Sequence, residues 1–234
     1  MIALLPFARP GAASSYTLAP SSDLALKPSS LTFPEAAALP LSALTAYQAL
    51  FTHADAQPGQ KLLVAGAGGG VGAIVVQMAV AARMVVTGVC SAGKADLVRG
   101  LGAHSVIDRE QTTLSSLSHD YDVVIDTIGS TTLPQLFPLL KGKGQLICIA
   151  RPATEDEKAQ RPDVRAMFFI VEPDGEELTR IVQCVEQEVL RPMVGKVMPL
   201  EAGAEAFDVV GKGGVGGKVV LEVEGRVDSP RLTM

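Results

Sequence analysis

The sequence predicts an α/β fold with a doubly wound parallel sheet, and three observations lead to it. Short apolar runs alternate with helix-like segments between residues 61 and 190. The runs are continuous in Val, Ile and Leu rather than alternating, which is typical of strands covered on both faces. A glycine-rich turn, VAGAGGGVG at residues 64–72, joins the first of these strands to the first helix. Strand–helix alternation with short connections favours a parallel, doubly wound sheet.

The expected elements follow in order along the chain. Residues 1–34 are rich in Pro, Ser and Ala and predict short extended pieces, and residues 34–51 predict a helix with a possible break near Pro40. Strands are expected at residues 61–67, 84–90, 104–108, 121–129, 144–150 and 167–172. Helices are expected at residues 71–82, 94–102, 131–140 and 175–190.

The glycine-rich turn has the composition of a diphosphate-binding site. A helix that begins directly after a strand presents free backbone N–H groups and the positive end of its dipole. Ala67, Gly69 and Gly72 fall at the spacing of the dinucleotide fingerprint, with Ala in place of the first Gly. The alternative is a tight turn without a ligand. The strand before it, the helix after it and the further strand–helix units favour a nucleotide site.

The segment after the second strand of this series favours NADPH over NADH. An NAD site usually has an acidic residue about 20 residues after the fingerprint, and residues 73–95 contain no Asp or Glu. The strand ends instead in CSAGK, where Ser91 can donate a hydrogen bond and Lys94 carries a positive charge. Both suit a 2′-phosphate, which an acid would repel. The alternative is that Lys94 is a solvated residue of the next helix.

Five motifs, in this order, resemble the medium-chain dehydrogenase/reductase superfamily: PEAAALPLSALTAYQAL, AGGGVG, CSAGK, VIDTIG and GKVVLEV. The resemblance extends over residues 11–223 and is strongest to the zinc-independent quinone oxidoreductases and enoyl reductases. It implies a Rossmann domain with remnants of a GroES-like catalytic domain. It also implies NADPH-dependent hydride transfer to a quinone or an activated double bond.

The resemblance further implies roles for individual residues. Thr45 would lie near the nicotinamide, and Ser91 and Lys94 would hold the 2′-phosphate. The residues expected to wrap the pyrophosphate are Gly68, Gly69, Gly70 and Val71. Those expected to line the nicotinamide side are Thr127, Ile149, Ala150 and Phe169, although core packing is the alternative for Ile149 and Phe169. Relatives often have a Tyr beside the adenine where this chain has Arg109.

We expect no metal site, and the sequence identifies no catalytic residue. Zinc-dependent relatives carry a ligand Cys four residues before the matching Thr, and Leu41 stands there in this chain. The histidines, His53, His104 and His119, are scattered and are interpreted as surface residues. Tyr47 is interpreted as a helix-packing residue rather than a proton donor.

Comparison with the family pattern divides the chain into three expected parts. Residues 1–34 resemble a remnant of the catalytic domain, residues 35–190 form the dinucleotide-binding domain, and residues 191–234 return to the catalytic domain. The chain is either a truncated product, with impaired activity, or a naturally short member with a reshaped site. Two other functions stay open: a non-catalytic NADPH-binding protein, and a non-redox enzyme on this scaffold.

Composition and charge limit the partners. The net charge of −5 and the absence of a basic block argue against nucleic acid and anionic membranes. The three scattered cysteines, and a start that lacks the basic region of a signal peptide, fit a cytoplasmic protein with reduced thiols. A small-molecule substrate is expected. The apolar segment 167–171, at the expected sheet edge, predicts a homodimer.

Overall fold

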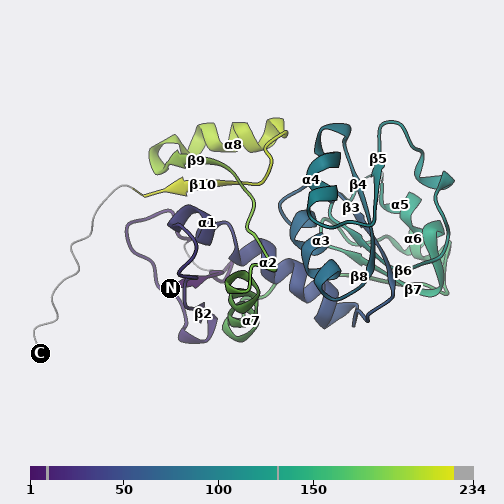
Figure 1. Cartoon of the computed structure of the whole chain (residues 1–234), viewed down its shortest axis with the longest axis horizontal. Coiled ribbons are helices and arrows are strands. Elements are labelled where there is room, and N and C mark those ends of the chain that lie inside the picture. The colour runs from purple at the N-terminus through teal and green to yellow at the C-terminus, as the bar shows by residue number, and fades with distance from the viewer. Residues whose placement is uncertain (9–10, 131, 224–234) are drawn as a thin grey trace, which may run out of the picture.

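The computed structural model describes residues 1–8, 11–130 and 132–223, and its largest element is a six-stranded sheet (Figure 1). The strands lie in the order β5–β4–β3–β6–β7–β8, and all neighbouring pairs are parallel. Their bounds are β3 Lys61–Ala65, β4 Val85–Cys90, β5 Ser105–Asp108, β6 Tyr121–Asp126, β7 Leu140–Cys148 and β8 Arg165–Phe168. Counted from β3, this is the 3-2-1-4-5-6 order of a doubly wound dinucleotide-binding sheet. The predicted fold class is confirmed.

Two clusters of buried apolar side chains cover the two faces of the sheet. Leu62 and Val64 of β3 belong to one cluster, and Leu63 and Ala65 belong to the other. Successive side chains of a strand point to opposite faces. The central strands therefore form continuous apolar runs, because side chains on both of their faces are buried.

Most helices lie where the sequence predicts them, but the segment expected to be helical at 131–140 forms only α5 and a 3-10 turn, and the strand expected from residue 144 already begins at Leu140. Position 131 of that helix and residues 224–234 of the expected C-terminal part lie outside the described residues. The bounds are α3 Gly72–Ala81, α4 Ala95–Gly100, α5 Leu133–Leu136 and α7 Gly175–Glu186. The helical region expected at residues 34–51 is divided into α1 (Phe33–Ala37), α2 (Pro40–Tyr47) and a π-helical segment (Gln48–His53). Pro40 has no N–H group to continue α1 and instead opens α2. The expected break at this proline is therefore present.

The strand expected at residues 167–172 is paired only as far as Phe168. Several further elements lay outside the prediction. They are α6 (Glu155–Ala159), β9 (Val194–Pro199), α8 (Gly203–Lys212) and β10 (Lys218–Glu222). β9 and β10 pair in parallel across α8, and the short strands β1 (Ile2–Ala3) and β2 (Leu24–Ala25) pair antiparallel.

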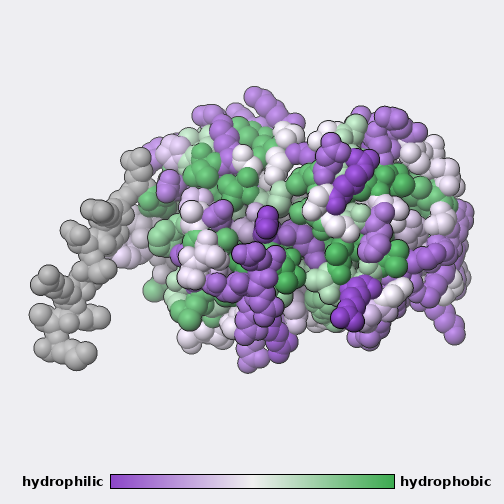
Figure 2. Space-filling view, in the orientation of Figure 1, coloured by the Kyte–Doolittle hydropathy of each residue, from purple (hydrophilic) through white to green (hydrophobic). Residues whose placement is uncertain are grey.

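The two small sheets lie together at one end of the molecule, on the other side of α2 and α7 from the large sheet (Figure 1). Figure 2 shows that apolar and hydrophilic residues are mixed over this face, both over the large sheet and over the end that holds the two small sheets. The N-terminal lobe, which comprises the described residues up to Pro40, exposes several large apolar side chains, namely Phe7, Tyr16, Leu18, Leu26 and Phe33. Within the described part of the chain, no helix has both the length and the apolar character needed to cross a membrane.

Candidate functional site

The carboxyl ends of β3 and β6 form the topological switch point of the sheet. β3 pairs with both β4 and β6, and the chain leaves these two central strands toward opposite edges. In open α/β sheets, ligands bind in the crevice at this point, beyond the carboxyl ends of the strands. Residues 66–71 follow β3 and residues 127–130 follow β6, so these two segments border the crevice.

The glycines of the turn after β3 have different physical roles. A Cβ on Gly72 would lie 2.2 Å from the carbonyl oxygen of Gly66, so α3 can begin this close to β3 only with glycine there. Gly66 itself has a positive φ of +83°, and a Cβ on it would lie 2.2 Å from Oγ1 of Thr127. Gly69 is exposed, and only the carbonyl oxygen of Gly66 lies within 4 Å of its ideal Cβ position, at 3.2 Å. The open side of the turn is therefore at Gly69.

The same turn presents backbone N–H groups at the start of α3. The N–H of Gly69 donates to Gly66 O, and the N–H of Ala73 donates to Gly69 O, both at 2.9 Å. Among the residues that the structure describes, no acceptor is paired with the N–H groups of Gly70 and Val71. Free N–H groups at the positive end of a helix dipole attract anions. The residues predicted to wrap a pyrophosphate, from Gly68 to Val71, therefore lie at the start of this helix, and their contact with a pyrophosphate stays a prediction.

Lys218 lies beside this turn and is a candidate binding residue that no local sequence motif predicts. It is the first residue of β10, and its Cε lies 3.0 Å from the position that a Cβ on Gly70 would occupy. Burial lowers the pKa of its ammonium group below the usual value. Within the described ranges, no hydrogen bond or ion pair reaches Lys218 Nζ. A half-buried cation without an anionic partner is unfavourable unless a ligand supplies the negative charge.

Lys94 approaches the glycine turn from the segment that follows β4. Its Cβ lies 2.7 Å from the ideal Cβ position of Gly68, and its Nζ donates to Gly214 O at 3.4 Å. Ser91 opens the short 3-10 helix that ends at Lys94, and its half-buried hydroxyl forms no helix-capping bond. The structure therefore brings Ser91 and Lys94 to the same edge as the glycine turn. Arg109 is exposed at the end of the adjacent strand β5.

The residues predicted for the nicotinamide side fall into two groups. Thr127 belongs to the crevice, since its Oγ1 donates to Ala65 O at 2.8 Å. Ile149 is joined to the end of β6 by its N–H bond to Asp126 O at 3.1 Å, and the exposed Ala150 follows it. Their position beyond β6 and β7 places them on the crevice side of the sheet.

Thr45 and Phe169 instead have their side chains engaged within the protein. Thr45 is buried in α2, and its hydroxyl donates to Leu41 O at 2.6 Å. The buried Phe169 ring packs against His53, with ring centroids 4.3 Å apart. Their predicted nicotinamide contacts stay predictions.

Asp126, at the end of β6, shapes the second border of the crevice. It is fully buried, and its carboxylate accepts the N–H groups of Ile128 and Gly129 at 3.0–3.1 Å. Burial raises the pKa of Asp126, while these N–H bonds and the charge of Arg151 act in the opposite direction. Its role is to hold the turn after β6, and an Asp directly after a buried apolar run is a sequence signal for such a turn.

Other groups of chemical interest are few in the described ranges. No cluster of three or more His, Cys, Asp or Glu side chains suited to a metal ion occurs among the described residues. Burial raises the pKa of the Cys148 thiol to about 12, so this cysteine is inert. Burial lowers the pKa of His53.

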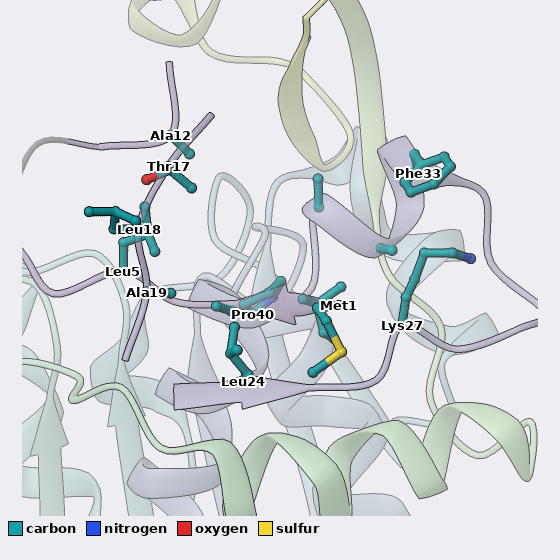
Figure 3. A pocket seen from close by; sticks show the side chains of 14 residues that line it. Met1, Leu5, Ala12, Thr17, Leu18, Ala19, Leu24, Lys27, Phe33 and Pro40 are labelled. Carbon is teal, nitrogen blue, oxygen red and sulfur yellow. The ribbon is translucent and has the colours of Figure 1, made fainter. Parts of the chain in front are cut away.

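A separate cavity of about 580 Å3 lies in the N-terminal lobe and is lined by residues between Met1 and Pro40 (Figure 3). Its walls are mainly apolar and include Leu18, Leu24 and Phe33. Lys27 reaches its rim, with Nζ 5.4 Å from the centroid of the Phe33 ring. Because none of its lining residues comes from the glycine turn, this cavity is distinct from the crevice. Pro40, which begins α2, connects the cavity to the helix that carries Thr45.

Comparison with known proteins agrees with this geometry. A family described as zinc-binding dehydrogenase matches residues 101–221. A probable zinc-binding oxidoreductase of mitochondria from Arthroderma benhamiae is 36% identical over 94% of this chain and 71% of its own length. An NADPH-dependent alkenal/one oxidoreductase of chloroplasts from Arabidopsis thaliana is 31% identical over 90% of this chain, which spans about half (53%) of that relative.

A solved structure of similar fold is the quinone oxidoreductase from Coxiella burnetii. It has a TM-score of 0.78 and 28% sequence identity, and the match covers 85% of this chain and 63% of that protein. The family match extends over more than half of the chain, and the relative from Arthroderma benhamiae is identical at 36% of the aligned residues. This chain is therefore a member of the medium-chain dehydrogenase/reductase superfamily, within its zinc-binding dehydrogenase family.

Proposed function

We propose that this chain binds NADPH and transfers hydride to a quinone or an α,β-unsaturated carbonyl compound. The observation that carries the proposal is the ammonium group of Lys218 beside Gly70, at the positive end of α3, which no residue in the described ranges pairs with. A diphosphate supplies the missing negative charge, and its oxygens can accept the N–H groups of Gly70 and Val71. The names of two relatives, an NADPH-dependent alkenal/one oxidoreductase and a quinone oxidoreductase, support this acceptor class.

The candidate residues of the crevice follow one another along the sheet edge in the order in which the parts of a dinucleotide would need them. Ser91 and Lys94 would hold a 2′-phosphate beside the adenosine, and the glycine turn with Lys218 would hold the diphosphate. Thr127, Ile149 and Ala150 would then border the nicotinamide. When bound, the nicotinamide would supply the hydride. The chain's own contribution is to orient the two reactants and to limit the access of water.

The acceptor is expected to be apolar. The cavity in the N-terminal lobe has mainly apolar walls, and it shares Pro40 with the helix that carries Thr45. A quinone ring or an enone with an alkyl chain matches such a surface. We also propose that the reaction uses no zinc, because Leu41 stands where zinc-dependent relatives have a ligand cysteine. A cytoplasmic location stays a proposal, since the two curated relatives described above are named as mitochondrial and chloroplastic.

The two lysines give a matched pair of variants for the cofactor. Lys94→Ala should weaken NADPH by about 10–100-fold and leave NADH nearly unchanged, because a charge-assisted bond contributes about 1.5–3 kcal/mol. Lys218→Met should weaken both cofactors to a similar degree, because both carry the diphosphate. Fluorescence titration of each variant with each cofactor measures this. Equal losses of NADPH and NADH affinity in Lys94→Ala would contradict the assignment of the 2′-phosphate.

The reaction is tested by following NADPH oxidation with naphthoquinone and with a small enone. We expect consumption of NADPH that depends on the acceptor. NADPH binding without any acceptor-dependent oxidation would favour a non-catalytic NADPH-binding protein. Failure to bind either cofactor would favour a non-redox enzyme on this scaffold.

We also propose that two copies pair through β8. This strand is the last one on one side of the sheet. Phe168, its final residue, is 36% exposed, and Ile170, which follows it, is 66% exposed. An uncovered edge strand with apolar side chains is a template for pairing. Light scattering at micromolar concentration should give a dimer mass for the unmodified chain and a monomer mass for Phe168→Lys. A monomer mass for both would contradict the proposal. Phe169 is unsuitable for this test because its ring is buried against His53.

A further inference from the structure

The segments after β6 and β7 lie side by side, and both border the predicted nicotinamide position. A Cβ on Gly129 would lie 3.0 Å from Cβ of Ala150 and 3.2 Å from Cγ of Arg151. The turn after β6 contains two consecutive residues of positive φ, Gly129 at +69° and Ser130 at +53°. A non-glycine residue in this region is under strain and is kept there only by surrounding contacts.

Arg151 makes those contacts from the neighbouring segment. Its Nη2 donates to Ser130 O at 2.9 Å, and the two Nη atoms donate to the two carboxylate oxygens of Glu157 at 2.9 and 2.6 Å. Nη1 also donates to Pro152 O at 2.9 Å. One planar guanidinium thereby joins the turn after β6, the segment after β7 and helix α6. Lysine cannot reproduce this arrangement, because it has a single nitrogen.

Glu157 is itself held in place for this contact. It forms a capping box at the start of α6: its carboxylate accepts the N–H of Thr154 at 2.8 Å, and its own N–H donates to Thr154 Oγ1 at 3.2 Å. The side chains of Arg151 and Glu157 are 30% and 12% exposed. The hydrogen bond from Arg151 is the main cause that lowers the pKa of Glu157 to about 2, so the pair is ionised at neutral pH.

We infer that Arg151 is a positioning residue that fixes the nicotinamide side of the crevice by clamping Ser130 to α6. This inference rests on the proposed NADPH site. The clamp acts on the shape of two backbone segments, Thr127–Ser130 and Ile149–Arg151, and not on the glycine turn. It should therefore affect binding of the nicotinamide half of the dinucleotide and leave the adenosine half unchanged.

The test compares NADPH with adenosine 2′,5′-bisphosphate, which has the adenosine half alone. By calorimetric titration, Arg151→Ala should weaken NADPH binding about tenfold, which corresponds to about 1.4 kcal/mol. The affinity for the bisphosphate should stay within about twofold of that of the unmodified chain. Arg151→Lys should recover only part of the NADPH affinity. Glu157→Gln should weaken NADPH in the same direction, and adding it to Arg151→Ala should cause little further loss.

Arg161 provides a matched control at the other end of β7. It pairs with Asp163 at 2.8 Å and donates to the carbonyl groups of Phe137 and Leu140 at 3.2 and 3.0 Å. Arg161→Ala thus removes an equivalent set of bonds away from the crevice. It should lower the melting temperature without changing the ratio of the two affinities.

Two results would overturn the inference. If the unmodified chain binds both probes and Arg151→Ala lowers both affinities equally, or neither, Arg151 does not position the nicotinamide side. If the unmodified chain binds neither probe, the proposed NADPH site fails, and the inference fails with it.

Discussion

The close approach of the start of α3 to the end of β3 is the constraint on which the site depends. The carbonyl oxygen of Gly66 occupies the space that a side chain at residue 72 would need. Glycine at that position lets the helix begin directly over the sheet edge, so that its first N–H groups lie at the switch point between β3 and β6. The remaining groups of the site are arranged around this backbone.

The charged groups come from segments far apart in the chain. Lys94 follows β4, whereas Lys218 begins β10 in the small sheet of β9 and β10, and the two side chains approach Gly68 and Gly70 respectively. The ammonium group of Lys218 lies beside Gly70, where a ligand of negative charge would stabilise it. The opposite border of the crevice is held by carboxylates, because Asp126 binds the turn after β6 internally and Glu157 holds it through Arg151. The positive charge is therefore concentrated on the side predicted for the phosphates.

The parts of this structure that follow from local patterns could be predicted from the sequence. The strands of the large sheet are continuous apolar runs, and Gly69 and Gly72 fall in a short, recognisable turn. The capping box of Thr154 and Glu157 is also a local signal, and it could have identified α6. By contrast, Lys218 lies beside a turn that is nearly 150 residues earlier in the chain, and its proximity to Gly70 arises only from the packing of β10. The contact between Arg151 and Ser130 likewise depends on the neighbouring positions of β6 and β7 in the sheet.

The central claim is that a diphosphate binds the open face of the turn at Gly69. The most direct measurement is calorimetric titration of NADPH into the unmodified chain, Gly69→Val and the control Gly100→Val. Gly100 has no atom within 4 Å of its ideal Cβ position, at the end of α4. We expect Gly69→Val to abolish binding, because its methyl groups occupy the approach to the backbone, while its melting temperature stays close to that of the control. If Gly69→Val binds NADPH as tightly as the unmodified chain does, the diphosphate does not lie on this turn.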